Sequence, residues 1–202
     1  MKRIFLIGIL WLSALAVTYA QQDTKAKKLL DQTTEIYQNA GGVSIHFTGS
    51  QNGKLLLDGN RFYLECGGVK SWFDGRTQWS YVSQNEEVTV SNPTEEELQT
   101  SKPNTWISMY KQSFNYRYAG QKTLKGKSGE EIILTPQKKQ DIKQITLLIG
   151  KDHVPQYICI ENRQGDKQEI IVQSYRSNQN YNDATFRFNE RQYPHAEIID
   201  MR

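Results

Sequence analysis

Between residues 23 and 40, apolar positions recur three and four residues apart. They are Ala26, Leu29, Leu30, Thr33, Ile36, Tyr37 and Ala40. This spacing predicts an amphipathic helix with one apolar face. Asp23 or Thr24 can cap its start, and the pair Gly41-Gly42 can end it.

After residue 42 the apolar period changes to two. The segment V-S-I-H-F places Val43, Ile45 and Phe47 on one face, and short turns such as D-G-N separate the segments that follow. Residues 43–91 therefore predict about six antiparallel strands. Strand patterns resume after residue 113, in F-N-Y-R-Y-A-G, E-I-I-L-T-P, I-K-Q-I-T-L-L-I-G, P-Q-Y-I-C-I-E-N and Q-E-I-I-V-Q-S-Y.

Residues 92–113 interrupt the strands with two short helical candidates. The first can be capped near Asn92 or Thr94, and Pro103 separates it from the second. The second carries the apolar side chains of Trp106, Ile107, Met109 and Tyr110. We expect these inserted helices to cover part of the sheet.

The predicted fold is mostly β with α. An antiparallel sheet commonly buries one face, and about eleven strands are many for one flat sheet. We therefore expect a curled antiparallel sheet, a half-barrel of about eleven strands. The N-terminal helix and the inserted helices are the segments available to cover its concave face.

Residues 1–20 have the organisation of a secretory signal peptide. Met-Lys-Arg is followed by an apolar run from Ile4 to Val17 and by T-Y-A before Gln21. We expect residues 21–202 to form a single exported domain that acts as a monomer. An uncleaved N-terminal anchor is the alternative. The residue directly after the expected cleavage point is Gln21 and not Cys, so we do not expect a lipid-anchored protein.

Charge and chemical motifs exclude several classes of function. Without Lys2 and Arg3, 23 basic and 22 acidic residues remain, and this balance argues against a nucleic-acid partner. No nucleophile, phosphate-binding or dinucleotide motif is present. From these missing motifs we expect no cofactor and no enzymatic activity. The three His are scattered and there is no C-x-x-C pair, so we expect no metal site. Cys66 and Cys159 could form a disulfide or be two buried small side chains.

The segment W-F-D-G-R-T-Q-W-S-Y, residues 72–81, gathers four aromatic residues around one turn. Trp72 and Trp79 flank that turn symmetrically, so they should face the same side of the sheet, with Tyr81 beside them. These rings could be ordinary cross-strand core pairs, walls of a cavity under the helices, or a sugar-stacking platform.

The same segment carries a resemblance to a known family. Asp74, Gly75, Arg76, Thr77, Trp79 and Tyr81 match the D-G-[KR]-T-x-W-x-Y pattern of the LolA-type periplasmic carriers of outer-membrane lipoproteins. Gly53, Leu55, Asn60 and Phe62 resemble the preceding hairpin of that family, and F-R-F-N-E-R-Q-Y-P-H-A-E-I-I-D is similar to its C-terminal segment. The chain departs from the family at Asp58-Gly59, where members carry a basic residue tied to lid closure. It departs again at Tyr193-Pro194, where a Gly is missing.

The resemblance implies a carrier that shields the acyl chains of lipoproteins in an apolar cavity and delivers them towards the outer membrane. Implied partners are acylated lipoproteins, an inner-membrane lipoprotein-releasing transporter and an outer-membrane acceptor, with transient membrane-associated contacts. The expected cavity residues are Phe47, Leu55, Phe62, Leu64, Trp72, Trp79, Tyr81, Val88 and Val90, and the expected lid residues are Trp106, Met109 and Tyr110. A lipid-binding, glycolipid-binding or envelope-sensing protein is the alternative, and a glycan-binding module is a further one.

Overall fold

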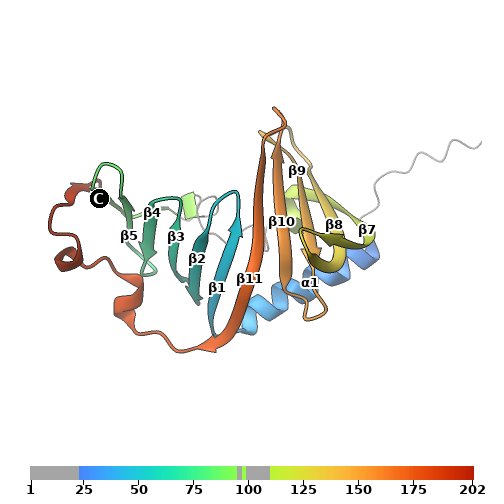
Figure 1. Ribbon diagram of the computed structural model, residues 1–202, viewed down its shortest axis with the longest axis horizontal. Coiled ribbons are helices and arrows are strands. Elements are labelled where there is room, and N and C mark those ends of the chain that lie inside the picture. Colours follow the sequence, from blue (N-terminus) through green and yellow to red (C-terminus); the bar gives the residue numbers. More distant parts are fainter. Residues whose placement is uncertain (1–22, 95–96, 99–109) are drawn as a thin grey trace, which may run out of the picture.

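The computed structural model contains one open, curled sheet with a long helix lying across one face (Figure 1). It describes residues 23–94, 97–98 and 110–202. The helix is α1 (Thr24–Asn39), and the strands are β1 (Gly42–Gly49), β2 (Gly53–Asp58), β3 (Arg61–Cys66), β4 (Val69–Phe73), β5 (Gln78–Val82), β6 (Glu87–Ser91), β7 (Phe114–Leu124), β8 (Lys127–Pro136), β9 (Ile142–Ile149), β10 (Pro155–Asn162), β11 (Lys167–Gln179) and β12 (Glu197–Asp200). Two short 3-10 helices, η1 (Asp183–Phe186) and η2 (Glu190–Gln192), lie between β11 and β12.

The sheet consists of two meanders joined side by side. Its strand order is β12-β6-β5-β4-β3-β2-β1-β11-β10-β9-β8-β7, so the pairing of β1 with β11 joins the meander β1–β6 to the meander β7–β11. All neighbours are antiparallel except β12, which pairs with β6 in parallel. The predicted curled antiparallel sheet is confirmed. The sequence pattern did not predict β12, because all four of its residues are exposed and it carries no alternation.

Helix α1 forms as predicted and is fixed at its first turn. The Asp23 carboxylate accepts hydrogen bonds from the backbone N–H groups of Lys25 and Ala26, which caps the helix. Its second oxygen accepts the backbone N–H of Tyr118 on the edge strand β7, at 3.0 Å. One side chain therefore caps the helix and ties it to the edge of the sheet. We call the face that α1 covers the inner face and the opposite one the outer face.

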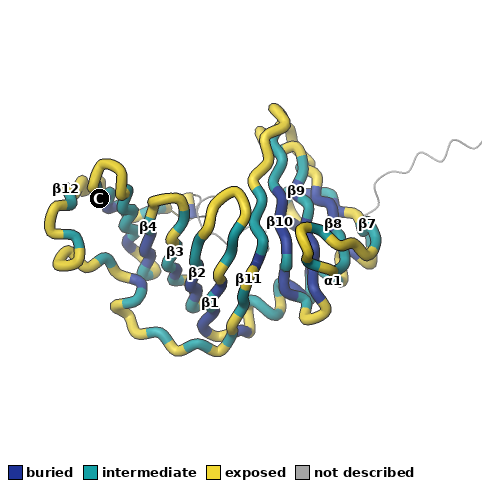
Figure 2. The backbone as a smooth tube through the Cα atoms, viewed as in Figure 1, coloured by how far each residue is buried: buried dark blue, intermediate teal, exposed yellow. Residues whose placement is uncertain are grey.

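Two apolar cores lie on the inner face, one for each meander. Ala26 and Leu30 of α1 pack on the strands β7–β10, around Leu147 and Ile149. The other core lies over β1–β4 and includes Val43, Leu57, Phe62, Phe73 and Leu98. Figure 2 shows buried positions alternating with less buried ones along several strands, as expected of a sheet with one well-covered face.

The inserted region returns to the sheet through a short helical turn. Residues 97–98 and 110–113 are helical. Tyr110 is buried, and its hydroxyl donates a hydrogen bond of 2.5 Å to Asp31 of α1. The other two expected lid residues, Trp106 and Met109, lie outside the described residues. No helix in the described part of the chain is long and apolar enough to cross a membrane.

Candidate functional site

An apolar cavity of about 400 Å³ opens on the inner face, where the two cores meet. Its walls come from the end of α1, from β1–β3 and from β10–β11. The apolar lining is Tyr37, Ile45, Phe47, Leu55, Leu57, Leu64, Pro155, Ile158, Ile160, Ile170 and Val172. The volume is within the range of roughly 300–1,000 Å³ that is typical of small-ligand sites.

Strand register explains why these side chains converge. Ile45 pairs with Leu55, and Leu55 pairs in turn with Leu64, so the three lie in one row across β1, β2 and β3. Side chains of directly paired residues share a face. On the other side of β1, Phe47 pairs with Val172 of β11. The β1–β11 pairing thus brings the apolar inner rows of the two meanders together.

Gly53 lets the ring of Phe47 lie across β2. The two residues are paired, and a Cβ atom on Gly53 would lie 2.2 Å from the Phe47 Cζ atom. Such a distance is far inside van der Waals contact. The absence of a side chain on Gly53 therefore sets the position of one cavity wall.

Tyr37 brings the C-terminal part of α1 to the cavity wall. Its ring packs edge-to-face on Tyr175 of β11, with the ring centroids 5.5 Å apart. Burial raises the pKa of the Tyr37 hydroxyl far above its usual range. The cavity wall is therefore uncharged at this position at any physiological pH.

The polar residues of the cavity lie at one end, and several of them are hydrogen-bonded within the protein. They are Ser50, Gln51, Cys66, Gln168 and Glu169. Ser50 Oγ accepts the backbone N–H of Glu169 at 2.9 Å, and the Cys66 thiol donates to Gln51 Oε1 at 3.1 Å. The side chain of Glu169 alternates with that of Ile170 and lies on the outer side of the sheet, where its carboxylate accepts the Tyr157 hydroxyl at 2.7 Å.

Ionisation of these groups follows from their neighbours. The Tyr157 hydroxyl and the Lys125 ammonium lower the pKa of Glu169, so this carboxylate is charged and paired. Burial raises the pKa of the Cys66 thiol, which stays protonated. Both cysteines are free; Cys66 lies at the inner cavity, whereas Cys159 packs with Leu148 and Tyr157 in a separate cluster. This outcome resolves the question that the sequence left open.

The predicted cavity residues are divided between the two faces of the sheet. Phe47, Leu55 and Leu64 line the inner cavity. Phe62 shares the inner face but packs in the core against Phe73, with ring centroids 5.6 Å apart. Paired rows place the remaining five on the outer face: Trp72, Trp79 and Val90 in one row, and Tyr81 and Val88 in the next.

The shared face of Trp72, Trp79 and Tyr81 is as expected, but the C-terminal segment covers part of it. The ring centroid of Trp72 lies 5.4 Å from that of Phe188 and 5.8 Å from that of Tyr193. The ring centroids of Tyr81 and Tyr193 are 4.6 Å apart. Trp72 is only 7% exposed. It does not present the flat open ring that a sugar-stacking platform would need.

The D-G-R-T segment is a structural turn. Asp74 Oδ1 accepts the backbone N–H groups of Arg76 and Thr77, and Gly75 has a φ of +101°. Arg187 of the C-terminal segment forms an ion pair of 3.0 Å with Asp74. The turn therefore also anchors that segment to the sheet.

Sequence reasoning missed the half of the cavity that belongs to the second meander. Ile158, Ile160, Ile170 and Val172 carry the alternating pattern of ordinary strands, and nothing in that pattern states which distant strand they will approach. A prediction of the β1–β11 pairing would have been needed to find them.

Comparison with known proteins places the chain in a family. A family model described as outer membrane lipoprotein carrier protein LolA matches residues 16–166. Among solved structures, an uncharacterized conserved protein from Thermus thermophilus is 12% identical, with a TM-score of 0.59 over 86% of this chain and 98% of that one. The Mycobacterium tuberculosis lipoprotein LppX is 15% identical, with a TM-score of 0.50 over 77% and 99%. At these identities the structures show a shared fold. A search of curated proteins finds no match. The chain belongs to the family of the outer membrane lipoprotein carrier protein LolA.

Proposed function

We propose that this protein carries lipoproteins through the periplasm and shields their acyl chains in the inner cavity. The observation that carries the proposal is the cavity itself, whose walls are apolar side chains from both meanders. Membership of the LolA family supports the same function. Phe47, Leu55 and Leu64 are proposed to contact the acyl chains, together with Ile158, Ile170 and Val172.

The energetics of acyl chains require such a cavity. Exposing one chain of about fifteen methylenes to water costs roughly 12 kcal/mol, at about 0.8 kcal/mol per CH₂. A carrier must bury most of that surface and still release it at its destination. Apolar contact without direction suits this purpose, since tight hydrogen bonds to the cargo would slow its release.

The polar end of the cavity is consistent with weak, non-directional binding. The side-chain oxygens of Ser50 and Gln51 already accept hydrogen bonds from within the protein. The cargo therefore gains affinity mainly from burial of its methylene groups. Each core is packed around its own buried residues, so the sheet can keep its shape when the cavity is empty.

The proposal includes a location and a set of partners. Residues 1–20 are proposed to act as a cleaved signal peptide that directs residues 21–202 to the periplasm. An inner-membrane transporter would load the carrier, and an outer-membrane acceptor would receive the lipoprotein. The role is one of binding and transfer without catalysis.

The co-purified cargo tests this proposal. We would purify the mature protein from the periplasm of a Gram-negative host and analyse it by native and denaturing mass spectrometry. A one-to-one complex with acylated lipoproteins is expected. Recovery of free lipid without lipoprotein would favour a lipid-binding or sensing function over the carrier function. A protein that retains neither lipoprotein nor lipid would contradict both functions.

A further inference from the structure

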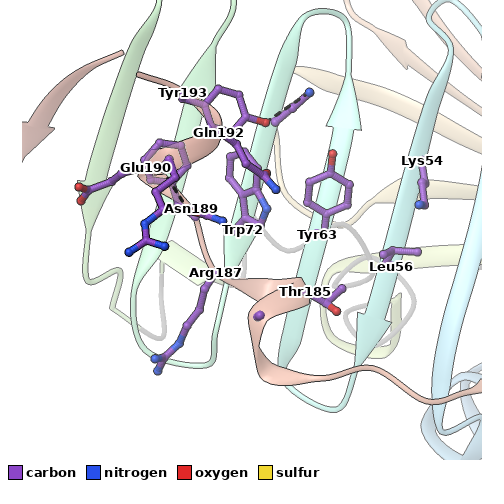
Figure 3. A pocket seen from close by; sticks show the side chains of 14 residues that line it. Lys54, Leu56, Tyr63, Trp72, Thr185, Arg187, Asn189, Glu190, Gln192 and Tyr193 are labelled. Carbon is purple, nitrogen blue, oxygen red and sulfur yellow. Dashed lines mark hydrogen bonds between the residues drawn. The ribbon is translucent and has the colours of Figure 1, made fainter. Parts of the chain in front are cut away.

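A second hollow lies on the outer face, between the sheet and the C-terminal segment. We call it the outer groove; its volume is about 830 Å³. Leu56, Tyr63 and Trp72 of β2, β3 and β4 form its floor, and residues 184–185 and 187–193 form its wall (Figure 3). The sheet itself separates this groove from the inner cavity, so the groove is a separate site.

The wall of the outer groove is held in place along its length. Phe186, fully buried, packs on Tyr181 with ring centroids 5.6 Å apart. Arg187 forms its ion pair with Asp74, and the ring of Tyr193 rests on Tyr81. Strand β12 then ties the end of the segment to β6. The groove is therefore built into the fold.

Charge in the outer groove is strongly one-sided. Lys54, Lys70, Arg187 and Arg191 line it, with Glu190 as the acidic residue among the lining side chains. This is a surplus of three positive charges in a chain whose whole net charge is +3. Positive charge gathered in a concave site attracts an anion.

Two of the four cations are available to a ligand. Arg187 is paired with Asp74, and Lys70 donates to the Tyr193 hydroxyl at 3.4 Å and lies 3.8 Å from Glu65. Lys54 and Arg191 form no ion pair within the described residues. Lys54 belongs to β2 and Arg191 to η2, so these two charges border the groove from different sides.

The form of the site indicates what kind of anion it takes. A phosphate group spreads its charge over several oxygens and can accept hydrogen bonds from an Arg and a Lys together. The groove is much larger than a bare phosphate, and the Tyr63 ring, which packs against Trp72, supplies ring surface for an organic body. In Figure 3 the Gln192 side chain points towards Trp72, where its amide can hydrogen-bond polar groups of that body.

We propose that the outer groove binds a phosphorylated headgroup, whose phosphate is attracted by the free positive charges that Lys54 and Arg191 place on two sides of the groove, and whose organic body lies over Tyr63. A soluble sugar phosphate and the headgroup of an anionic lipid share this chemistry. The outer groove is separate from the acyl-chain cavity, so this proposal does not depend on the proposed carrier function.

Binding of soluble and membrane-bound phosphates tests the proposal. Isothermal titration calorimetry would use glucose 1-phosphate, with glucose as the neutral control. Flotation would use phosphatidylcholine vesicles with and without phosphatidylglycerol. Lys54→Gln and Arg191→Gln should each weaken binding about fivefold, as expected for the loss of one cation near a phosphate. The matched control is Lys139→Gln. Lys139 is exposed and is not among the residues that line the groove, so its replacement should leave binding unchanged.

The binding results distinguish a free phosphorylated ligand from a lipid headgroup and can also overturn the proposal. Binding of glucose 1-phosphate that depends on Lys54 and Arg191 supports a free phosphorylated ligand. Vesicle binding that needs phosphatidylglycerol and the same two residues supports a lipid headgroup. The proposal is overturned if neither probe binds, if glucose binds as well as its phosphate, or if Lys139→Gln weakens binding as much as the groove variants do.

Discussion

Gly53 is the residue whose missing side chain most directly shapes the inner cavity. A Cβ atom there would meet the Phe47 ring at 2.2 Å and the backbone oxygen of Glu65 at 2.6 Å. The Phe47 ring could move away only by shifting a cavity wall, and the Glu65 oxygen only by disturbing the pairing of β2 with β3. The position of Gly53 in the family-like hairpin motif thus has a physical reason.

Replacement of this glycine gives the first prediction. Gly53→Ala should lower the free energy of unfolding by about 1–3 kcal/mol, the usual range for overpacking, and should weaken uptake of a fluorescent fatty-acid analogue. Gly59→Ala is the control, because Gly59 has a φ of +56° but open space around it. The control should cost about 1 kcal/mol of backbone strain without affecting uptake. Equal uptake by all three proteins would contradict this account of the wall.

Asp31 is the residue that links α1 to the returning end of the insertion. Its carboxylate accepts the Tyr110 hydroxyl and pairs with Lys111 and Lys27, each at 2.6 Å. Burial opposes its ionisation, but the two ammonium groups and the hydroxyl hold the pKa of Asp31 well below its ordinary value. Because the folded-state pKa is depressed, the stabilisation is present above about pH 4 and is lost as the pH falls below it.

The second prediction follows from this linkage. Asp31→Asn should lower the free energy of unfolding at pH 7 by about 1 kcal/mol, a value kept small because the side chain is one-third exposed. Below pH 3 the difference from the native chain should shrink. Urea titrations at both pH values measure it, and a difference that stays constant would show that the carboxylate charge is not responsible.

Individual side chains also show how far the sequence predicts the site. The two-residue period placed Trp72, Trp79 and Tyr81 together, and the structure agrees. The same period does not state which face is the inner one. The inner face is defined by the position of α1 and the outer face by the C-terminal segment. Both contact strands that are far away in the sequence. The predicted role of these three rings at an acyl chain remains a prediction without structural support.

At the scale of elements, the C-terminal segment acts as a strap across the outer face. It leaves β11, packs through Phe186, Phe188 and Tyr193, and ends as β12 beside β6. Ile198 and Ile199 of β12 remain exposed. The stability of the strap therefore depends on its aromatic anchors and its backbone pairing more than on the side chains of β12.

The third prediction concerns those anchors. Phe186→Ala should lower the free energy of unfolding by about 3 kcal/mol, because the ring is fully buried. Phe188→Ala, two residues away and only partly buried, should cost clearly less. Chemical denaturation measures both variants, and hydrogen exchange should show early loss of protection in β12 for Phe186→Ala. A larger effect of Phe188→Ala would contradict the assignment of the main anchor.

Elements with strong periodicity were predictable, and those fixed by distant pairing were not. Helix α1 has both an apolar face and a capping Asp23, so local sequence determines it. Strand β12 is four exposed residues held by backbone hydrogen bonds such as that from Met201 N–H to Val90 O. Such bonds leave no pattern in the sequence.

At the scale of the whole molecule, two meanders share one sheet and leave an apolar hollow where they meet. The hollow borders both cores and shares wall residues with them, such as Leu55 and Ile158, but each core also has buried members away from it, such as Phe73 and Leu147. A protein built in this way can be stable when empty and can still gain free energy by burying an apolar ligand. This combination of two packed cores with an apolar hollow between them is the central physical feature of the proposed carrier.

Two adjacent residues of β11 offer the sharpest comparison for this central claim. Ile170 lines the inner cavity, whereas Ile171 packs on the outer side with Leu148 and Tyr157. Both are partly buried and chemically identical. A charge introduced at Ile170 enters the proposed acyl-chain site, and the same charge at Ile171 does not.

The most direct measurement is retention of an acylated lipoprotein in solution after detergent removal, with the mature protein, Ile170→Glu or Ile171→Glu present. Circular dichroism first establishes that both variants fold, and an unacylated form of the lipoprotein serves as the control cargo. The account predicts a soluble one-to-one complex for the native chain and for Ile171→Glu, and sedimentation of the lipoprotein with Ile170→Glu. Sedimentation with the native chain, or equal retention by both variants, would contradict the claim that the inner cavity carries acyl chains.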